Sequence, residues 1–190
     1  MYIISNGLVN RTVQVWDVST GDELKVLKGH TDRVRSVACL PDGKQIVSGS
    51  DNNSVKVWDA STGNNLKELE GHTHSITSVT FSPNGKQIIS GSADGSVQVW
   101  DASMGNKVLE DQAYYLVTLV TILPDGKQIV SGSEDQTVQV WNASMGNNLK
   151  VLEGHTHQSH WLHFHQMANR LSLAWPTTQC RFGMHPRATR

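Results

Sequence analysis

The sequence predicts an all-β protein built from about four copies of one antiparallel unit, each with four short strands. Three landmarks that recur with one period predict this fold. The first is a Gly-His pair, and the second is the segment PDGKQIVSGS or PNGKQIISGS. The third is a tryptophan that follows TVQV, SVKV or SVQV at intervals of 42, 42 and 41 residues: Trp16, Trp58, Trp100 and Trp141.

The third copy shows why each element is expected to be a strand. Residues 75–81 are rich in β-forming side chains and end at a turn in which Pro83 fixes φ and Gly85 accepts a positive φ. The apolar run at residues 87–92 fits a strand that is covered on both faces, and the tight turn at 93–95 follows it. The alternating segment 96–101 and the stretch after the next turn complete four strands without any helical period.

Composition excludes several classes of protein. The 190 residues carry 16 Lys and Arg against 17 Asp and Glu, so the net charge of −1 offers no basic surface for nucleic acid. Cys39 and Cys180 lie far apart and fit free thiols in a reducing compartment. The sequence shows no apolar run of about 20 residues and no secretory leader, so no membrane partner and a cytoplasmic location are expected.

The repeated residues resemble the WD40 family, since the repeat length, the Gly-His pair and the Trp-Asp pair match that family over residues 2–157. The resemblance implies a β-propeller, in which four-stranded blades surround a central channel. It also implies a scaffold that binds other proteins, with no catalytic activity and no cofactor. The near-identity of the copies looks like the duplicated arrays of fungal NACHT-type receptor proteins.

The strand count predicts a WD40 propeller whose ring is incomplete. Residues 2–5 align with a second strand, so the first blade is expected to have three strands. An open arc exposes strand edges and blade faces, which favour self-association, and it would suit a fragment of a larger WD40 array. The alternative is a closed ring of four blades in which residues 161–165 supply the missing strand. The repeat region is expected over residues 1–157, with blades at about 2–29, 30–71, 72–113 and 114–154.

Residues 158–190 form an irregular tail that does not continue the repeat. If one base is missing after codon 157, four codon junctions in the tail must encode Leu, Gly, Ala and Ala. The last three match Gly85, Ala93 and Ala102 of the third repeat. The sequence therefore predicts that the tail is a frame-shifted remnant of a fifth repeat.

In the WD40 family a His, a Ser, an Asp and the Trp of one repeat form a buried hydrogen-bonded chain. The third repeat matches all four positions. The second has Asn52 in place of Asp, the fourth lacks its Gly-His pair, and the first has Asn6 and Asn10 at the Ser and Asp positions. The resemblance assigns this structural role to His30, Ser48 and Trp58, to His72, Ser90, Asp94 and Trp100, and to Ser131, Asp135 and Trp141.

Two enzymatic alternatives arise from the same residue types. A Ser, His and Asp set also makes a catalytic triad, but a triad needs one exposed nucleophile beside an oxyanion hole. Here the same structural positions recur once per repeat, beside a tryptophan expected to be buried. A metal-binding or hydrolytic site could use the histidines of the tail, although no carboxylate or thiolate accompanies them. These are His155, His157, His160, His163 and His165. No catalytic residue and no metal ligand is therefore predicted.

The residues that differ between copies are the candidates for a partner surface, because the shared residues hold the blade. Arginine and tyrosine are common among the residues that dominate binding energy at protein interfaces. The candidates in or beside turns are Arg33, Arg35, Asp51, Tyr114, Tyr115 and Glu134.

Overall fold

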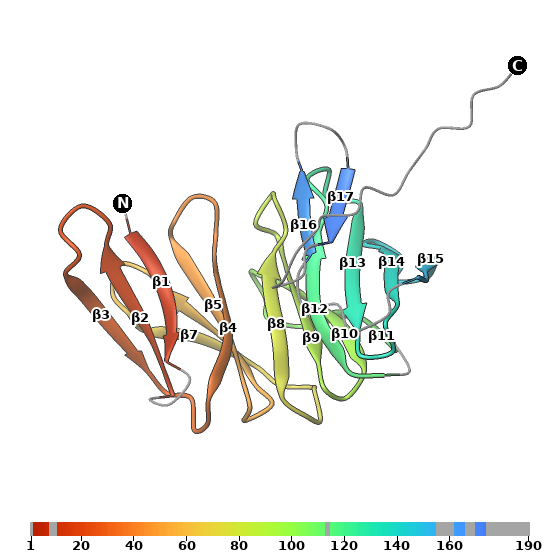
Figure 1. Ribbon diagram of the computed structural model, residues 1–190. Coiled ribbons are helices and arrows are strands. Elements are labelled where there is room, and N and C mark those ends of the chain that lie inside the picture. The colour runs from red at the N-terminus through yellow and green to blue at the C-terminus, as the bar shows by residue number, and fades with distance from the viewer. Residues whose placement is uncertain (1, 8–10, 113–114, 155–161, 166–169, 174–190) are drawn as a thin grey trace, which may run out of the picture.

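The computed structural model describes residues 2–7, 11–112, 115–154, 162–165 and 170–173 (Figure 1). This part of the chain contains strands and no helix, and hence no helix able to cross a membrane. The all-β class predicted from the repeat is confirmed. A further prediction, an irregular tail, needs correction, because β16 (Leu162–His165) and β17 (Arg170–Leu173) pair as an antiparallel hairpin.

The repeats fold into four antiparallel meanders, each with its strands in chain order. The first sheet has three strands: β1 (Tyr2–Gly7), β2 (Thr12–Asp17) and β3 (Glu23–Lys28). The second contains β4 (Val34–Cys39), β5 (Gln45–Ser50), β6 (Val55–Asp59) and β7 (Asn65–Leu69). The third contains β8 (Ile76–Phe81), β9 (Gln87–Ser92), β10 (Ser96–Asp101) and β11 (Lys107–Gln112). The fourth contains β12 (Val117–Ile122), β13 (Gln128–Ser133), β14 (Val138–Asn142) and β15 (Asn148–Leu152).

The two middle strands of each complete sheet are apolar because neighbouring sheets cover both of their faces. In β5, β9 and β13 every residue after the first is buried. The outermost strands β7 and β11 bury few side chains, and their remaining residues face solvent. A strand covered on both faces is a continuous apolar run, and a half-covered strand alternates. The pattern of apolar residues in each strand therefore indicates how far the strand lies from the solvent-exposed edge of the blade.

The hydrophobic core lies between the sheets. One cluster joins Val57 and Leu69 of the second sheet to Ile76 and Trp100 of the third. A second joins Val99 of the third sheet to residues of the fourth, and a third joins the first two sheets. Each blade is thus stabilised by packing against the blades next to it, as in other repeat architectures.

The sheets fan out as an open arc (Figure 1). The innermost strands β4, β8 and β12 contact one another in order, and β1 contacts β4. Within the described residues β16 contacts β12 and pairs only with β17, at the other end of the arc from β1. The alternative of a closed ring of four blades is therefore wrong for this structure, since β16 does not pair with β1.

Candidate functional site

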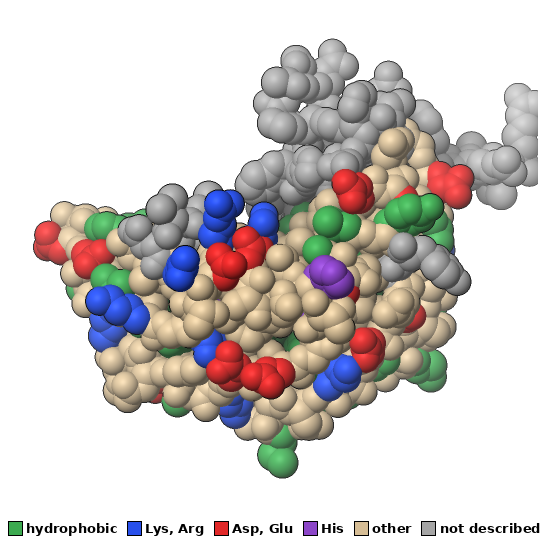
Figure 2. Space-filling model, turned by 90° about the horizontal axis from the view of Figure 1, so that it is seen from below, with side chains coloured by type: hydrophobic (Ala, Val, Ile, Leu, Met, Phe, Trp, Pro, Cys, Tyr) green, Lys and Arg blue, Asp and Glu red, His purple; other side chains and the backbone are tan. Residues whose placement is uncertain are grey.

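Two sets of loops meet at one end of the sheets, which we call the lower face because it lies at the bottom of Figure 1. It comprises the loops into the innermost strands and the hairpins between the two middle strands: residues 30–33, 51–53, 72–75, 93–95, 115–116 and 134–136. Backbone hydrogen bonds join the two sets, with the Asp51 N–H donating to the Arg33 carbonyl at 2.8 Å. The Ala93 and Glu134 N–H groups donate in the same way to Ser75 and Leu116. Figure 2 shows this face, with basic and acidic side chains interspersed over it.

A four-residue hydrogen-bonded chain runs inward from the lower face in the third sheet. The Trp100 indole N–H donates to Ser90 Oγ at 2.8 Å. Ser90 Oγ lies 2.8 Å from His72 Nε2, and His72 Nδ1 lies 3.0 Å from Asp94 Oδ2. The chain links a loop, two strands and a hairpin, so it fixes the hairpin to the body of the blade.

The donors in this chain determine where its protons lie. An indole N–H can only donate and an ionised carboxylate can only accept. Ser90 Oγ therefore accepts from Trp100 and donates to His72 Nε2, while His72 Nδ1–H donates to Asp94. Burial acts to raise the pKa of Asp94, but the bonds from His72, Ser96 and the Thr73 N–H hold it well below its usual range. The carboxylate is thus ionised and keeps the imidazole in one tautomer.

The second sheet repeats the chain with an amide in place of the carboxylate. His30 Nε2 lies 2.7 Å from Ser48 Oγ, and Trp58 donates to the same oxygen at 2.8 Å. His30 Nδ1 lies 3.3 Å from Asn52 Oδ1, a longer contact than that with Asp94 in the third sheet. Burial lowers the pKa of His30 to about 4, and Lys56 also lowers it. His30 is consequently a neutral side chain at physiological pH.

The fourth and first sheets keep only part of this hydrogen-bonded chain of side chains. Trp141 donates to Ser131 Oγ at 2.8 Å, and Asp135 accepts from the N–H and hydroxyl of Thr137. In the first sheet Trp16 donates to Ser5 Oγ at 2.9 Å. The prediction that Asn6 takes the serine position is therefore wrong. The first hairpin holds one more residue than the others, so counting back from Trp16 misses Ser5 by one; Asn10 lies outside the described residues.

The candidate partner residues lie on or beside the lower face. Arg35 forms an ion pair with Asp51, and Arg33 is exposed on the adjoining loop. Burial raises the pKa of Asp51, but the hydrogen bonds from Arg35 and Ser75 and the charges of Arg35 and Arg33 together lower it by more, so the net shift is downward. Tyr115 and Glu134 are exposed on the fourth sheet, two blades away. Tyr114 lies outside the described residues.

Comparisons with known proteins agree with this geometry. A family model described as the IFT122 first beta-propeller matches residues 2–182, which is most of the chain. The chain belongs to the WD40-type β-propeller family.

The curated relatives share one repeat or slightly more with this WD40 chain. Nuclear distribution protein PAC1 of Coccidioides posadasii is 39% identical over 49 residues, which cover 26% of this chain and 10% of that protein. Coronin-7 of Mus musculus is 39% identical over 46 residues, covering 24% and 5%. PAC1-2 of Postia placenta is 42% identical over 41 residues, covering 22% and 10%. The matched segments thus span one tenth or less of each relative. The finer resemblance to NACHT-type receptor proteins stays a prediction.

The serines that accept from the tryptophans in the three complete WD40 blades are inaccessible to a substrate. Ser48 and Ser90 are 0% exposed and Ser131 is 1% exposed, beneath the hairpins that their partners hold. A nucleophile must reach the reacting carbonyl, so these hydroxyls cannot serve a hydrolase. Among the described side chains no group of three or more His, Cys, Asp or Glu could hold a metal ion. The tail histidines proposed for the metal alternative lie outside those side chains.

Backbone strain on the lower face was not predicted from the sequence. Arg11, Asn53 and Gln136 adopt φ angles of 58°, 67° and 71° at the turn position that Gly95 fills in the third sheet. Residues with a Cβ rarely adopt this left-handed region. Three WD40 hairpins thus carry a polar side chain at a tip where glycine would be less strained, a cost typical of functional surfaces.

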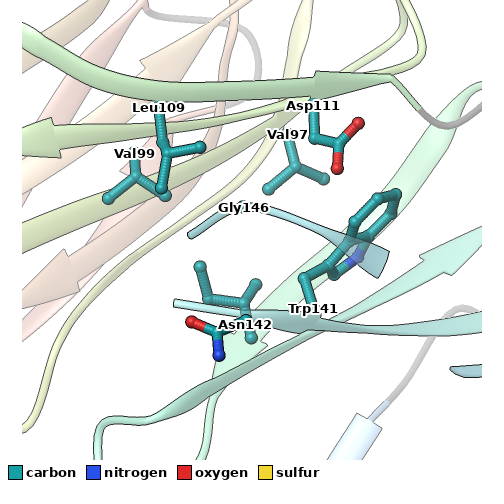
Figure 3. Close-up of a pocket in the computed structure, with 8 residues that line it drawn as sticks. Val97, Val99, Leu109, Asp111, Trp141, Asn142 and Gly146 are labelled. Atoms are coloured by element: carbon teal, nitrogen blue, oxygen red, sulfur yellow. The ribbon is translucent and has the colours of Figure 1, made fainter. Parts of the chain in front are cut away.

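A crevice separates the third and fourth blades (Figure 3). The crevice is shallow, with an enclosed space of about 10 Å³, and its lining is mostly apolar. Strand register places Asp111 opposite Val97, just as Leu27 lies opposite Val13 and Leu69 opposite Val55. A carboxylate thus occupies the position that leucine fills in the two preceding blades. The residues that line the crevice are Val97, Val99, Leu109, Asp111, Ile129, Trp141, Asn142 and Gly146.

Proposed function

We propose that the chain is a protein-interaction scaffold whose lower face docks other proteins. The observation that carries the proposal is the contrast between the repeated residues that hold the blades together and the variable residues of the lower face. The hydrogen-bonded chains repeat beneath the face, whereas the residues at equivalent positions on it differ. Arg33 corresponds to Ser75 and Leu116, and Asp51 corresponds to Ala93 and Glu134.

This division suits specific binding. A rigid framework lowers the entropy lost when surface side chains become ordered on binding. Arginine and tyrosine supply most of the binding energy in many interfaces. The lower face offers Arg33 and Arg35 on one blade and Tyr115 on another, so one partner could contact both. The near-balanced charge of the chain supports a protein partner over nucleic acid.

The test is capture of proteins by the purified chain, quantified for matched variants. The pair Arg33→Ala and Arg35→Ala removes two cations from the lower face. The control pair Lys44→Ala and Lys86→Ala removes two exposed cations from the opposite end of the sheets, where each lysine carbonyl binds a turn between the outer strands. A partner of the lower face should be lost with the first pair and kept with the second. Equal capture by both pairs would contradict the proposal.

The proposal extends to location, chemistry and assembly. The family is generally non-catalytic, so the chain is proposed to bind and not to react. The exposed free thiol of Cys39 suits the reducing cytoplasm. The open arc leaves strand edges and blade faces that favour self-association. Metal binding by the tail stays the less favoured alternative, and zinc at stoichiometric amounts in purified protein would revive it.

A further inference from the structure

Arginine and lysine occupy different parts of the blades. Residues 1–157 contain three arginines, and all of them lie on or beside the lower face of the first two blades. Arg11 precedes β2 in its hairpin, while Arg33 and Arg35 flank the first residue of β4. The nine lysines of the same region lie within strands or in turns at the opposite end of the sheets. In Figure 2 basic side chains gather over the left half of this face, the side of these two blades.

The three arginines are not needed to hold a blade together. The other blades fill the equivalent positions with quite different side chains: Ser75 and Leu116 for Arg33, Thr77 and Thr118 for Arg35, and Asn53, Gly95 and Gln136 for Arg11. A blade therefore folds without arginine at any of these positions. The chemistry of arginine at the lower face is a property of the surface.

Arg11 is present although its position favours glycine. Its φ of 58° lies in the left-handed region, which Gly95 occupies without a Cβ in the third blade. The Arg11 side chain is exposed. A strained residue that packs against nothing in the core is typical of a functional surface, where the strain is offset by what the side chain binds.

The position of Arg11 brings it to the loop that carries Arg33. The equivalent Asn53 of the second blade donates from Nδ2 to the Thr73 carbonyl at 3.1 Å, in the loop that leads into the following blade. The hairpin of the first blade stands in the same relation to residues 30–33, since β1 and β2 both contact β4. The longer side chain of Arg11 thus lies beside this loop, and arginines from two blades meet there.

Asp51 holds Arg35 in place beneath the same loop. It forms an ion pair with Arg35 and accepts a hydrogen bond from Ser75 of the next blade. The Asp51 side chain is 13% exposed and that of Arg35 is 46% exposed, so the guanidinium faces solvent and the carboxylate does not. The charge of Arg33 also helps to lower the pKa of Asp51, which shows that Arg33 lies nearby. Such a fixed guanidinium loses little entropy when it binds.

The composition of this cluster indicates what it binds. Arginine presents a planar fork of donors that matches an oxyanion in two hydrogen bonds, whereas lysine is a point charge. The three arginines exceed the neighbouring carboxylates of Asp32 and Asp51 by a single charge. So small a surplus suits singly charged carboxylates better than phosphate, and it does not suit the dense charge of nucleic acid.

We propose that the lower face of the first two blades binds an acidic segment of a partner protein, whose carboxylates pair with Arg11, Arg33 and Arg35. This inference rests on the docking role proposed above for the lower face and names the chemistry of the partner. Because the arginines come from a hairpin, a loop and the start of a strand, acidic side chains spaced along an extended segment can each reach one guanidinium.

The first test titrates the full chain with a synthetic peptide in which four glutamates alternate with glycines. Arginine Nε–H signals in proton–nitrogen NMR spectra report on each guanidinium separately, so binding at these three is distinguished from binding elsewhere. Three charge-assisted contacts, less the cost of association, correspond to a Kd of about 1 mM at low salt. The same peptide with glutamine in place of glutamate should leave the three signals unmoved.

Arg11→Gly separates binding from folding. Glycine relieves the positive φ, so the melting temperature should rise, while the Kd for the glutamate peptide should rise about threefold. Arg33→Gln should raise the Kd by a similar factor, because it removes an exposed charge without breaking the ion pair of Arg35. The matched control is Lys86→Gln, which removes an exposed cation at the opposite end of the sheets and should leave the Kd unchanged.

A glutamate peptide that shifts all three arginine signals and binds more weakly to both arginine variants supports the proposal. Binding that either arginine variant leaves unchanged, or no shift at roughly 10 mM peptide, overturns it. A peptide with two phosphoserines carries a charge similar to four glutamates; if it binds more than about tenfold tighter, the site recognises phosphate and the proposal is wrong. Protein capture that Arg33→Ala with Arg35→Ala abolishes would still support docking on the lower face, by a partner of other chemistry.

Discussion

Asp111→Leu should stabilise the protein, because it fills the crevice between the third and fourth blades. Leucine at this register position is 2% exposed in each of the two preceding blades, as Leu27 and Leu69. Asp111 instead brings a carboxylate to a crevice lined by Val97, Ile129 and Trp141. The native aspartate therefore neither covers these apolar surfaces nor remains fully hydrated.

The expected gain can be worked from this difference. Burying a leucine side chain contributes about 1.5–3 kcal/mol when burial is complete. The crevice is partly open and Leu109 already leans on Gly146, so part of this gain is lost. Replacing aspartate in a strand by an apolar residue adds up to about 1 kcal/mol. We expect Asp111→Leu to raise the free energy of unfolding by about 1–3 kcal/mol.

Urea unfolding followed by tryptophan fluorescence measures the change in the free energy of unfolding. The dependence of this free energy on urea concentration should be the same for parent and variant, which shows that both unfold in the same transition. Asp111→Asn is the control, since it removes the charge without filling space, and it should shift stability by less than about 0.5 kcal/mol. Leu109→Lys together with Asp111→Leu would restore the Lys and Leu pair of the second blade. If Asp111→Leu is no more stable than Asp111→Asn, the crevice is not a packing defect.

Three further predictions concern the hydrogen-bonded chains and the strained hairpins. Trp100→Ala should cost about 3–5 kcal/mol for lost core packing, and Asp94→Ala about 1–3 kcal/mol because it leaves buried donors unpaired; denaturant melts that match the parent would contradict this. Gln136→Gly should stabilise by about 0.5–1 kcal/mol by relieving the positive φ, and Gly95→Gln should destabilise, both read from thermal melts. His30 has a pKa of about 4 in the fold against 6.5 unfolded, so the unfolded chain binds the extra proton between these values. Stability should therefore be complete above pH 6.5 and fall as the pH drops towards 4, by at most about 1.4 kcal/mol per pH unit from this residue. His30→Gln should flatten that slope, and an unchanged slope would refute the assignment.

The sequence predicts the blades well because each element is specified locally and repeatedly. Strands, turns and the pairing of tryptophan with serine recur at fixed spacing, so one repeat supports the assignment of the next. The bond between Ser5 and Trp16 was not predicted, because the hairpin between them is one residue longer than in the other blades. Counting back from the tryptophan therefore reaches the wrong residue, although β1 and β2 pair in the usual way. The spacing carries no information on such an insertion.

The crevice and the strained hairpins could not be predicted from the sequence, for two different reasons. Strand pairing places Asp111 opposite Val97, as Leu152 lies opposite Val138, with the same bulge beside the tryptophan in both blades. The letters VLE occur at 108–110 and again at 151–153, so matching letters alone would align Leu109, and not Asp111, with Leu152. Glycine at position 95 signals a positive φ, but Asn53 and Gln136 adopt the same angle without that signal. There the surrounding hairpin imposes the backbone conformation, whatever side chain it carries.

The meander order of every sheet has a consequence for how the chain acquires its structure. Each strand pairs with the strand next to it in sequence, so short loops close before distant segments must meet. Such local pairing favours rapid formation of hairpins, on a scale of about 1–10 µs. The identical segments QIVSGS of β5 and β13 could otherwise exchange partners between blades, a misfolding route typical of repeat proteins. Because β5 meets β4 and β6 first, the speed of local closure protects near-identical blades from assembling with one another's strands.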